Sequence, residues 1–226
     1  MPAKAPATLA AALAVLLANL PFGCAGMQAP VQSGVPFTAA QIWTLDSTYT
    51  DRVNGVVFRY PSVWRAETSF GYHPPALTYS TEKPIAGFGY EEGSFPRDHV
   101  VGPYSSTNLE GFGIVYSAAV AANMGECDAR AASISDAPKP RMFVFGGRTF
   151  FERETSSAGM SQSMSGKLYA TYVHPNCYLF ETNVATSSAG VTDGIVSSLT
   201  PAQLRIIQTH LLRIMESVRI AQAKEQ

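Results

Sequence analysis

Charged residues are scarce in this sequence, and the few that occur are spread along the chain. They make up 15% of the 226 residues, and the formal net charge is -1. Basic and acidic residues are interspersed, so no run of Lys or Arg can neutralise a row of phosphates. With 46% hydrophobic residues, the composition is that of an ordinary globular protein. These features argue against nucleic acid as a partner and against a disordered chain.

Motifs for catalysis and for cofactors are lacking as well. The histidines show neither the i,i+4 nor the His-x-His spacing of paired zinc ligands; they are His73, His99, His174 and His210. Residues 159–163 (GMSQS) lack the second Gly of the G-x-S-x-G turn of serine hydrolases. Glu152 and Glu154 share one face of a predicted strand, for which a solvated sheet face is the ordinary interpretation. We therefore predict no catalytic residue, no metal site and no cofactor.

The main apolar run lies near the amino terminus and is too short for a permanent membrane helix. Lys4 precedes an Ala/Leu/Val stretch at residues 7–20, which Asn19 and Pro21 interrupt, and small residues follow. A transmembrane helix needs about 20 apolar residues. The order of cation, apolar run and small residues is that of a secretory signal. We therefore predict that residues 1–23 are a signal peptide and that the chain is exported.

Cys24 directly follows the small residue Gly23 at the end of this leader. Leu20, Gly23 and Cys24 resemble the lipobox of bacterial lipoproteins, in which the Cys is acylated and becomes the new amino terminus, although Leu20 is one place earlier than in that pattern. The alternative is ordinary cleavage after Ala25, which leaves Gly26 first. The prediction is lipidation at Cys24, which implies a membrane anchor at the periplasmic or surface face of the bacterial cell envelope.

Cysteine is rare, with three residues in the chain. Once Cys24 is set aside, Cys127 and Cys177 remain as a pair in an exported protein, and a disulfide is their expected state. It would close a loop of about 50 residues. The alternatives are a reactive thiol beside His174 and a metal pair. A lone His-x-x-Cys motif is weak, however, and Pro175-Asn176 within it is typical of a turn.

The mature chain is predicted to consist of a tether and one domain. Residues 24–41 are small, uncharged and Pro-containing, as in a flexible linker. The domain spans residues 42–226. Within it, Asn54-Gly55 predicts a hairpin with a type I′ turn, and Gly146-Gly147 predicts a second two-residue hairpin. Strands are expected at 56–60, 86–91, 112–120, 142–145, 148–154, 160–173 and 177–186, with a short helix up to residue 132.

The last segment reads as an amphipathic helix. Thr200, Pro201 and Gln203 predict its start, with an N-cap, a proline in the first turn and a capping box. Apolar residues then recur at spacings of three and four: Leu204, Ile207, Leu211, Ile214, Val218 and Ala221. We expect this stripe to pack on the apolar face of the sheet. The predicted fold class is α+β, an antiparallel β-sheet (a meander) with a C-terminal helix on one face.

The segment Phe58-x-Tyr60-Pro61-Ser62-x-Trp64 resembles the F-x-Y-P-x-x-W opening of PsbP-like domains, the fold of the extrinsic photosystem II protein. The later order, a meander followed by a closing helix, is similar too. Uncharacterised bacterial secreted proteins show a further resemblance, at Cys127, Gly147-x-x-Phe150 and Cys177-Tyr178-Leu179-Phe180-Glu181. The resemblance covers roughly residues 42–221. It implies a PsbP-like fold, and no metal or cofactor role carries over.

Residues 70–104 are rich in Tyr, Gly and Pro. Aromatic rings on loops often bind sugars, peptides or proteins, so Tyr72, Tyr79, Tyr90 and Tyr104 are the candidate ligand-binding residues. The alternative is that these rings cover the edge of the sheet. We predict a non-enzymatic binding or scaffold module, anchored to the membrane by its lipid, with an envelope protein or a glycan as partner. The alternative is a small secreted hydrolase or metal-handling enzyme whose site is assembled from distant residues.

Overall fold

The computed structural model describes residues 37–68, 83–92, 102–136, 139–159 and 161–221. These residues form an α+β fold, as the sequence predicts. The helices are α1 (Ala39–Trp43), α2 (Met124–Ala132), α3 (Ala189–Thr192) and α4 (Pro201–Ser217). The strands are β1 (Ser47–Asp51), β2 (Val56–Tyr60), β3 (Arg65–Glu67), β4 (Ala86–Glu91), β5 (Leu109–Val120), β6 (Arg141–Phe145), β7 (Arg148–Gly159), β8 (Gln162–Val173), β9 (Asn176–Ser187) and β10 (Arg219–Ile220).

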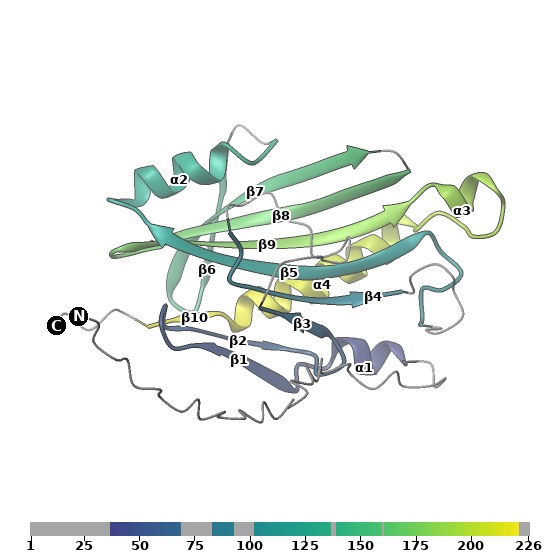
Figure 1. The fold of residues 1–226 in the computed structure, drawn as a ribbon, viewed down its shortest axis with the longest axis horizontal. Coiled ribbons are helices and arrows are strands. Elements are labelled where there is room, and N and C mark those ends of the chain that lie inside the picture. Colours follow the sequence, from purple (N-terminus) through teal and green to yellow (C-terminus); the bar gives the residue numbers. More distant parts are fainter. Residues whose placement is uncertain (1–36, 69–82, 93–101, 137–138, 160, 222–226) are drawn as a thin grey trace, which may run out of the picture. The chain divides into compact units, whose positions relative to one another are not determined.

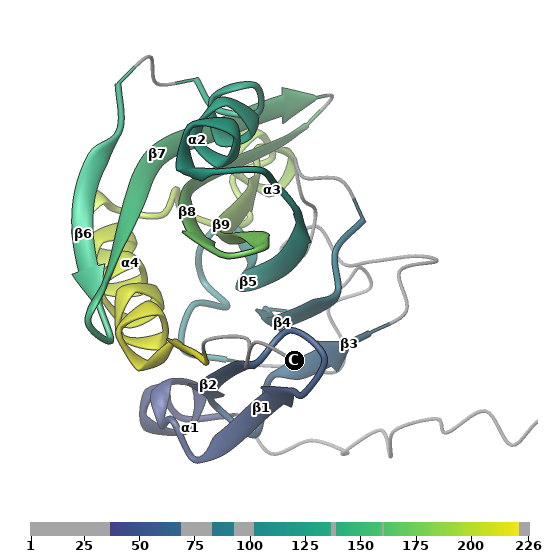
Figure 2. The ribbon, with the colours of Figure 1, turned by 90° about the vertical axis from the view of Figure 1, so that its left-hand side faces the viewer.

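Seven strands form one large sheet in the order β3-β4-β5-β9-β8-β7-β6, and β1, β2 and β10 form a small one. All pairings within the two sheets are antiparallel, and β6 to β9 make the predicted meander (Figure 1). In Figure 2, α2 lies on one face of the large sheet, and α4 lies on the other face together with the small sheet. Because both faces of the central strands are covered, most of β9 is buried.

The main hydrophobic core lies between the large sheet and the layer formed by α4 and the small sheet. Its centre is aromatic. Phe180 of β9 stacks on Tyr116 of β5 with ring centroids 5.1 Å apart, and Phe58 of β2 lies 6.3 Å from Phe180. α4 contributes its predicted stripe, of which the following residues are buried: Ile207, Leu211 and Ile214. The core therefore joins the small sheet, the large sheet and α4 into one unit.

The first hairpin forms, but its turn differs from the prediction. Asp51 pairs with Val56, so the loop between them has four residues rather than the two of a type I′ turn. The Asp51 carboxylate accepts hydrogen bonds from the backbone N–H groups of Val53 and Asn54 at 2.9 and 3.1 Å. Gly55 has a positive φ of 68°, whereas Asn54 does not. The prediction is wrong because the carboxylate at the strand end stabilises a longer loop. The second, Gly-Gly hairpin has the predicted form, with both glycines at positive φ.

The folded domain begins earlier than predicted. Thr38 and Gln41 form a capping box that starts α1. Trp43, the last residue of α1, lies between Phe112 of β5 and His210 of α4, with ring centroids 4.4 Å from each. The predicted tether, which ends at residue 41, is therefore too long. Its composition is that of a linker, but Thr-x-x-Gln is a helix start.

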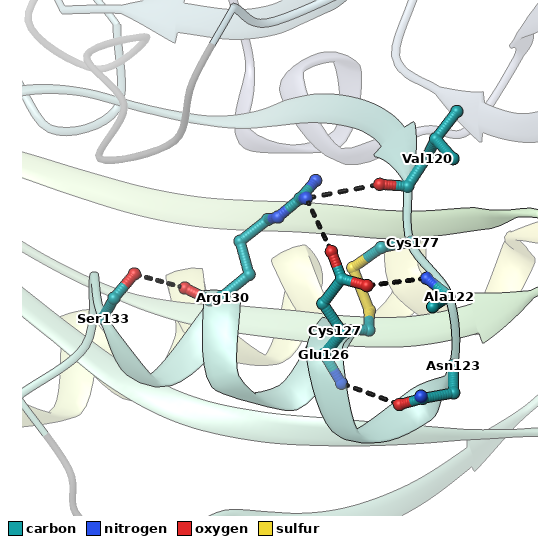
Figure 3. A network of polar contacts seen from close by, with 8 residues as sticks. All are labelled: Val120, Ala122, Asn123, Glu126, Cys127, Arg130, Ser133 and Cys177. Carbon is teal, nitrogen blue, oxygen red and sulfur yellow. Dashed lines mark hydrogen bonds and ion pairs between the residues drawn. A yellow bond between two sulfur atoms is a disulfide. The ribbon is translucent and has the colours of Figure 1, made fainter.

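A disulfide between Cys127 and Cys177 fixes α2 to the large sheet (Figure 3). The two Cα atoms are 5.3 Å apart, which confirms the predicted bond. The backbone N–H of Ala121 donates a hydrogen bond to the carbonyl of Pro175 at 3.0 Å. The segment before α2 therefore lies against the turn between β8 and β9, as the predicted bond required.

Polar groups at the start of α2 satisfy one another (Figure 3). Asn123 is the N-cap, and its side-chain oxygen accepts a hydrogen bond from the Glu126 N–H at 3.0 Å. The Glu126 carboxylate accepts one from the Ala122 N–H at 2.7 Å. Arg130, one turn later, lies 3.6 Å from Glu126 and donates to the Val120 carbonyl at 3.3 Å. These contacts tie the short helix to the end of β5.

α4 starts as predicted and ends sooner. The Thr200 hydroxyl accepts a hydrogen bond from the Gln203 N–H at 3.2 Å, and the Gln203 side chain accepts one from the Thr200 N–H at 2.9 Å. The helix ends at Ser217, and the chain then forms β10 beside β2. The apolar pattern predicted helix beyond this point. Val218 of that pattern is buried beyond the end of the helix, as is Ile220, whereas Ala221 is exposed, so burial persists for a few residues while the secondary structure changes.

Candidate functional site

A groove of about 230 Å³ lies between α4 and strands β8 and β9. Its floor consists of Ser165, Gly166, Lys167 and Tyr169 of β8 and Thr182 and Val184 of β9. Its wall consists of Arg205, Gln208, Thr209, Leu211 and Leu212 of α4. The lining combines apolar side chains with hydroxyl and amide groups, and its two charged residues are both cations. Such a mixture is typical of sites that bind small molecules.

The register of the sheet assembles the floor of this groove. Lys167 of β8 pairs with Thr182 of β9 on one side and with Glu154 of β7 on the other. Two residues further along β8, Tyr169 pairs with Glu152 of β7. Side chains of directly paired residues share a face, and so do alternate residues of one strand. Two rows of side chains from three strands therefore face the α4 side together.

Lys167 of the groove floor forms an ion pair with Glu152, which is buried and does not line the groove. The Lys167 ammonium donates to Oε1 of Glu152 at 3.1 Å, and the two side chains are 30% and 2% exposed, respectively. Oε2 of Glu152 has no hydrogen-bond partner in the described part of the chain. Burial, and next the charge of Glu152, raise the pKa of the Tyr169 hydroxyl. The buried carboxylate thus depends on Lys167 for its compensating charge.

The prediction of a solvated face for the two glutamates is correct for Glu154 and wrong for Glu152. Glu154 is exposed, whereas Glu152 is buried. The reason lies in the next strands, because the row of Glu152 continues through Tyr169 to Phe180 in the aromatic core. Neighbouring positions of one face of a strand can therefore differ in burial.

Arg205 is the exposed cation of the groove wall. None of the ion pairs found among the described residues includes it. Lys167 uses one of its three ammonium donors on Glu152, which leaves further donor capacity. The groove therefore presents positively charged hydrogen-bond donors, and no acid is part of its lining.

A second polar cluster lies in the core at the end of β4. Glu92 and Tyr90 are 6% and 3% exposed. A Cβ at Gly102 would overlap both the Tyr90 hydroxyl and the Glu92 carboxylate, so these groups lie directly against the glycine backbone. Burial raises the pKa of both Glu92 and Tyr90. Among the described residues, no ion pair compensates Glu92. The cluster is separate from the groove and bears on stability.

The predicted aromatic binding surface is wrong for Tyr90 and Tyr104. Their side chains are only 3% and 7% exposed. The ring centroids of Tyr90 and Tyr104 lie 5.2 and 6.3 Å from that of Phe112 in the core. Tyr90 alternates along β4 with glycines and shares the inner face with Phe88, so its ring is part of the core. The other two candidates, Tyr72 and Tyr79, lie outside the described residues.

Cys24, the predicted lipidation site, lies outside the described residues, as does His99. His174 is exposed at the turn between β8 and β9, and its Nδ1 lies 2.9 Å from the Tyr172 hydroxyl. Cys177 is held in the disulfide, so it is not a free thiol beside His174.

Neither a metal cluster nor a membrane helix occurs in the described ranges. No three His, Cys, Asp or Glu residues there are grouped so that they could hold a metal ion. No helix there combines the length and apolarity needed to cross a membrane.

No local pattern of the sequence predicts the groove residues, because they come from three segments far apart in the chain. A signal was nevertheless present. Lys167 is a single cation at the start of an apolar strand pattern, on the same face as Tyr169. Arg205, Gln208 and Thr209 flank the apolar stripe of the last helix. Joining the two observations required the register of β8 and the crossing point of α4, which periodicity alone does not provide.

No protein-family model matches the chain, and no curated protein matches its sequence. Solved structures with similarity include the cyanobacterial PsbP protein (CyanoP) of Synechocystis sp. PCC 6803, at 9% identity and a TM-score of 0.42, covering 77% of this chain and 92% of that one. The Ran-binding protein Mog1p of Saccharomyces cerevisiae has 8% identity and a TM-score of 0.42, covering 78% and 95%. LpqN of Mycobacterium tuberculosis, involved in cell envelope biogenesis, has 12% identity and a TM-score of 0.40, covering 83% and 90%.

Proposed function

We propose that this protein is an exported, non-enzymatic binding module of the bacterial cell envelope whose ligand lies in the groove between α4 and strands β8 and β9. The observation that carries the proposal is the groove itself, about 230 Å³ in volume, with an apolar, polar and cationic lining. Small-molecule sites combine an apolar surface with a few polar groups that fix orientation. The volume is below the roughly 300–1,000 Å³ that is usual for ligand pockets, so it suits a small molecule or one end of a larger one.

The groove is built on regular secondary structure rather than on loops. β8 and β9 pair along their whole length, from Gln162 opposite Ser187 to Val173 opposite Asn176. α4 has a capping box at its start and a buried apolar stripe. Side chains on such elements keep their positions better than side chains on loops. This rigidity supports a preformed site.

Export is part of the proposal and rests on two features. The leader at residues 1–23 has the order of a secretory signal. The disulfide between Cys127 and Cys177 is typical of proteins that fold in an oxidising compartment. An acylated Cys24 would attach the domain to a membrane through the residues before α1.

Filling the groove tests the proposed function. The Cys24→Ser variant serves as background, since it removes the acylation target and allows purification without detergent. In that background, Thr209→Trp places an indole in the groove from an exposed position on α4. Ile206→Trp is the matched control, because Ile206 is exposed on the same helix and does not line the groove. Native mass spectrometry of protein from its own envelope should show a bound small molecule in the background and in Ile206→Trp, and none in Thr209→Trp. Equal occupancy of both tryptophan variants, or no bound molecule in the background, would overturn the proposal.

The lipid anchor has a separate test. Membrane-extracted protein should have an intact mass that corresponds to a chain beginning at Cys24 with acyl chains attached. Cys24→Ser should release the protein from the membrane. An amino terminus at Gly26 would show ordinary signal-peptidase cleavage instead, and would contradict the anchor without affecting the groove.

A further inference from the structure

We infer that the groove between α4 and strands β8 and β9 prefers an anionic amphiphile, a small molecule with one acidic head group on an apolar chain or ring. The head group is a carboxylate or a phosphate monoester, which share the chemistry of a compact anion with several acceptor oxygens. The inference rests on the proposed function, because it names the class of ligand for the same groove.

The preference for an anion follows from how the charges around the groove are compensated. Lys167 and Glu152 neutralise each other at the floor, at 3.1 Å. Glu154, opposite Lys167 in the next strand, is exposed and does not line the groove. Arg205 remains as a cation outside every ion pair of the described residues. A guanidinium binds carboxylate and phosphate oxygens through two parallel hydrogen bonds. A cationic ligand would meet repulsion from Arg205, with no acid in the groove lining to offset it.

The need for an apolar part follows from the rest of the lining. Leu211 and Leu212 project from α4, and Val184 lies opposite them on β9. Val184 and Leu211 are almost fully buried, whereas Leu212 is half-buried. The accessible apolar surface therefore comes mainly from Leu212, and a sugar or another wholly polar ligand would leave it without an apolar partner. An alkyl chain or an aromatic ring covers it and removes it from water.

A pair of ligands that differ only in head group tests the inference. Octanoate and 1-octanol have the same chain length, and octyl phosphate supplies the second head group. Each is titrated into the ¹⁵N-labelled full chain carrying Cys24→Ser, and amide shifts of Gly166, Lys167 and Thr182 report on the groove. Octanoate and octyl phosphate should bind about tenfold more tightly than 1-octanol, since charge-assisted hydrogen bonds are stronger than neutral ones.

Arg205→Gln should abolish this preference and leave the affinity for 1-octanol unchanged. Arg213→Gln is the control, because Arg213 is exposed on the same helix and does not line the groove; it should keep the preference. Lys167 is left in place, since its loss would leave the buried Glu152 uncompensated. If none of the three ligands shifts the groove amides, the proposed function fails. If all three bind equally, or if Arg205→Gln keeps the preference, the groove remains a site and the anion inference alone is overturned.

Discussion

The two faces of the large sheet are held by different means. Under α4 the contacts are between large rings and branched aliphatic side chains, and α4 buries four residues of its seventeen. On the other face α2 has nine residues and buries two, Cys127 and Ala131. The buried cluster beneath α2 contains few residues, and most of them are small: Ala121, Cys127, Ala131, Leu168, Ala170, Cys177 and Leu179. A short helix with so little apolar surface needs a covalent bond to stay in place.

Polar side chains buried on the α2 face contact the helix itself or cross a neighbouring strand. Arg153 of β7 is 3% exposed, and its guanidinium lies 2.8 Å from the Asp128 carboxylate of α2. Asn183 of β9 is fully buried, and its side-chain oxygen lies over Gly166 of β8, where a Cβ would overlap it. On this face, glycine is required where a polar side chain crosses the neighbouring strand. Specific polar and covalent contacts thus replace the bulk packing of the α4 side.

Adjacent residues of β9 give the most direct test of this difference. Phe180 faces the α4 side and Leu179 faces the α2 side. Phe180→Ala should lower the free energy of unfolding by about 3–5 kcal/mol, because it opens a cavity among packed rings. Leu179→Ala should cost about 2 kcal/mol, because Leu179 already borders a small pocket beside α2 that water can fill. Urea unfolding measures both, and an equal or larger loss for Leu179→Ala would remove the contrast between the faces.

Reduction of the disulfide should have the next largest effect. Cys127 and Cys177 are 50 residues apart, so the loop-closure model gives about 4 kcal/mol of stabilisation. Cys127→Ser should leave Cys177 as a free thiol and destabilise the domain by up to that amount. Amide hydrogen exchange should speed up more in α2 than in α4, because α2 buries two residues and α4 buries four in the main core. A uniform increase in both helices would show that α2 is held by packing after all.

Glu92 lies in the core on the α4 side. Its replacement should stabilise the fold, whereas the changes described above destabilise it. Burial raises the pKa of its carboxyl above the ordinary 4.5, so the folded protein binds this proton more tightly than the unfolded chain. The charged form therefore destabilises the fold at neutral pH, and this penalty disappears as pH falls through the raised pKa towards 4.5. Glu92→Gln should raise the melting temperature at pH 7, by less than the disulfide contributes, and the gain should vanish near pH 4.

The exposed Glu216 of α4 provides the control for this prediction. Glu216→Gln should leave the melting temperature nearly unchanged at both pH values, since an exposed carboxylate is well solvated in both states. A gain for Glu92→Gln that persists at pH 4 would mean that packing, rather than the buried charge, is responsible.

Most elements of the fold could be predicted from the sequence because local chemistry specifies them. The Gly-Gly turn, the Thr200 cap and the paired cysteines each act within a few residues or follow from the compartment. Errors arose where a distant group decides the outcome. Tyr90 lies in a stretch rich in Tyr, Gly and Pro, yet the pairing of β4 with β5 places its ring beside Phe112.

The candidate groove was beyond prediction for the same reason. Glu152, Lys167 and Arg205 are brought together only by strand register and by the position of α4. α1 is hard to predict for a different reason. Thr38 and Gln41 have the pattern of a capping box, but the composition of the residues around them is that of a linker. At this position a short capping motif predicts the structure better than the average composition of the eighteen residues of the predicted tether.

The two capping boxes allow the smallest effect to be tested within one molecule. Thr38 and Thr200 make the same contact, accepting a hydrogen bond from the N–H of a glutamine three residues later, at 3.3 and 3.2 Å. Thr200→Ala should lower the free energy of unfolding by about 1 kcal/mol, because α4 belongs to the main core and unfolds with it. Thr38→Ala should change global unfolding less, because α1 has five residues and can open alone. Its opening should be visible as a change in the fluorescence of Trp43, which packs against Phe112 and His210. Equal losses of global stability in both variants would mean that α1 is as integral to the cooperative unit as α4, and no loss in either would contradict the role of the caps.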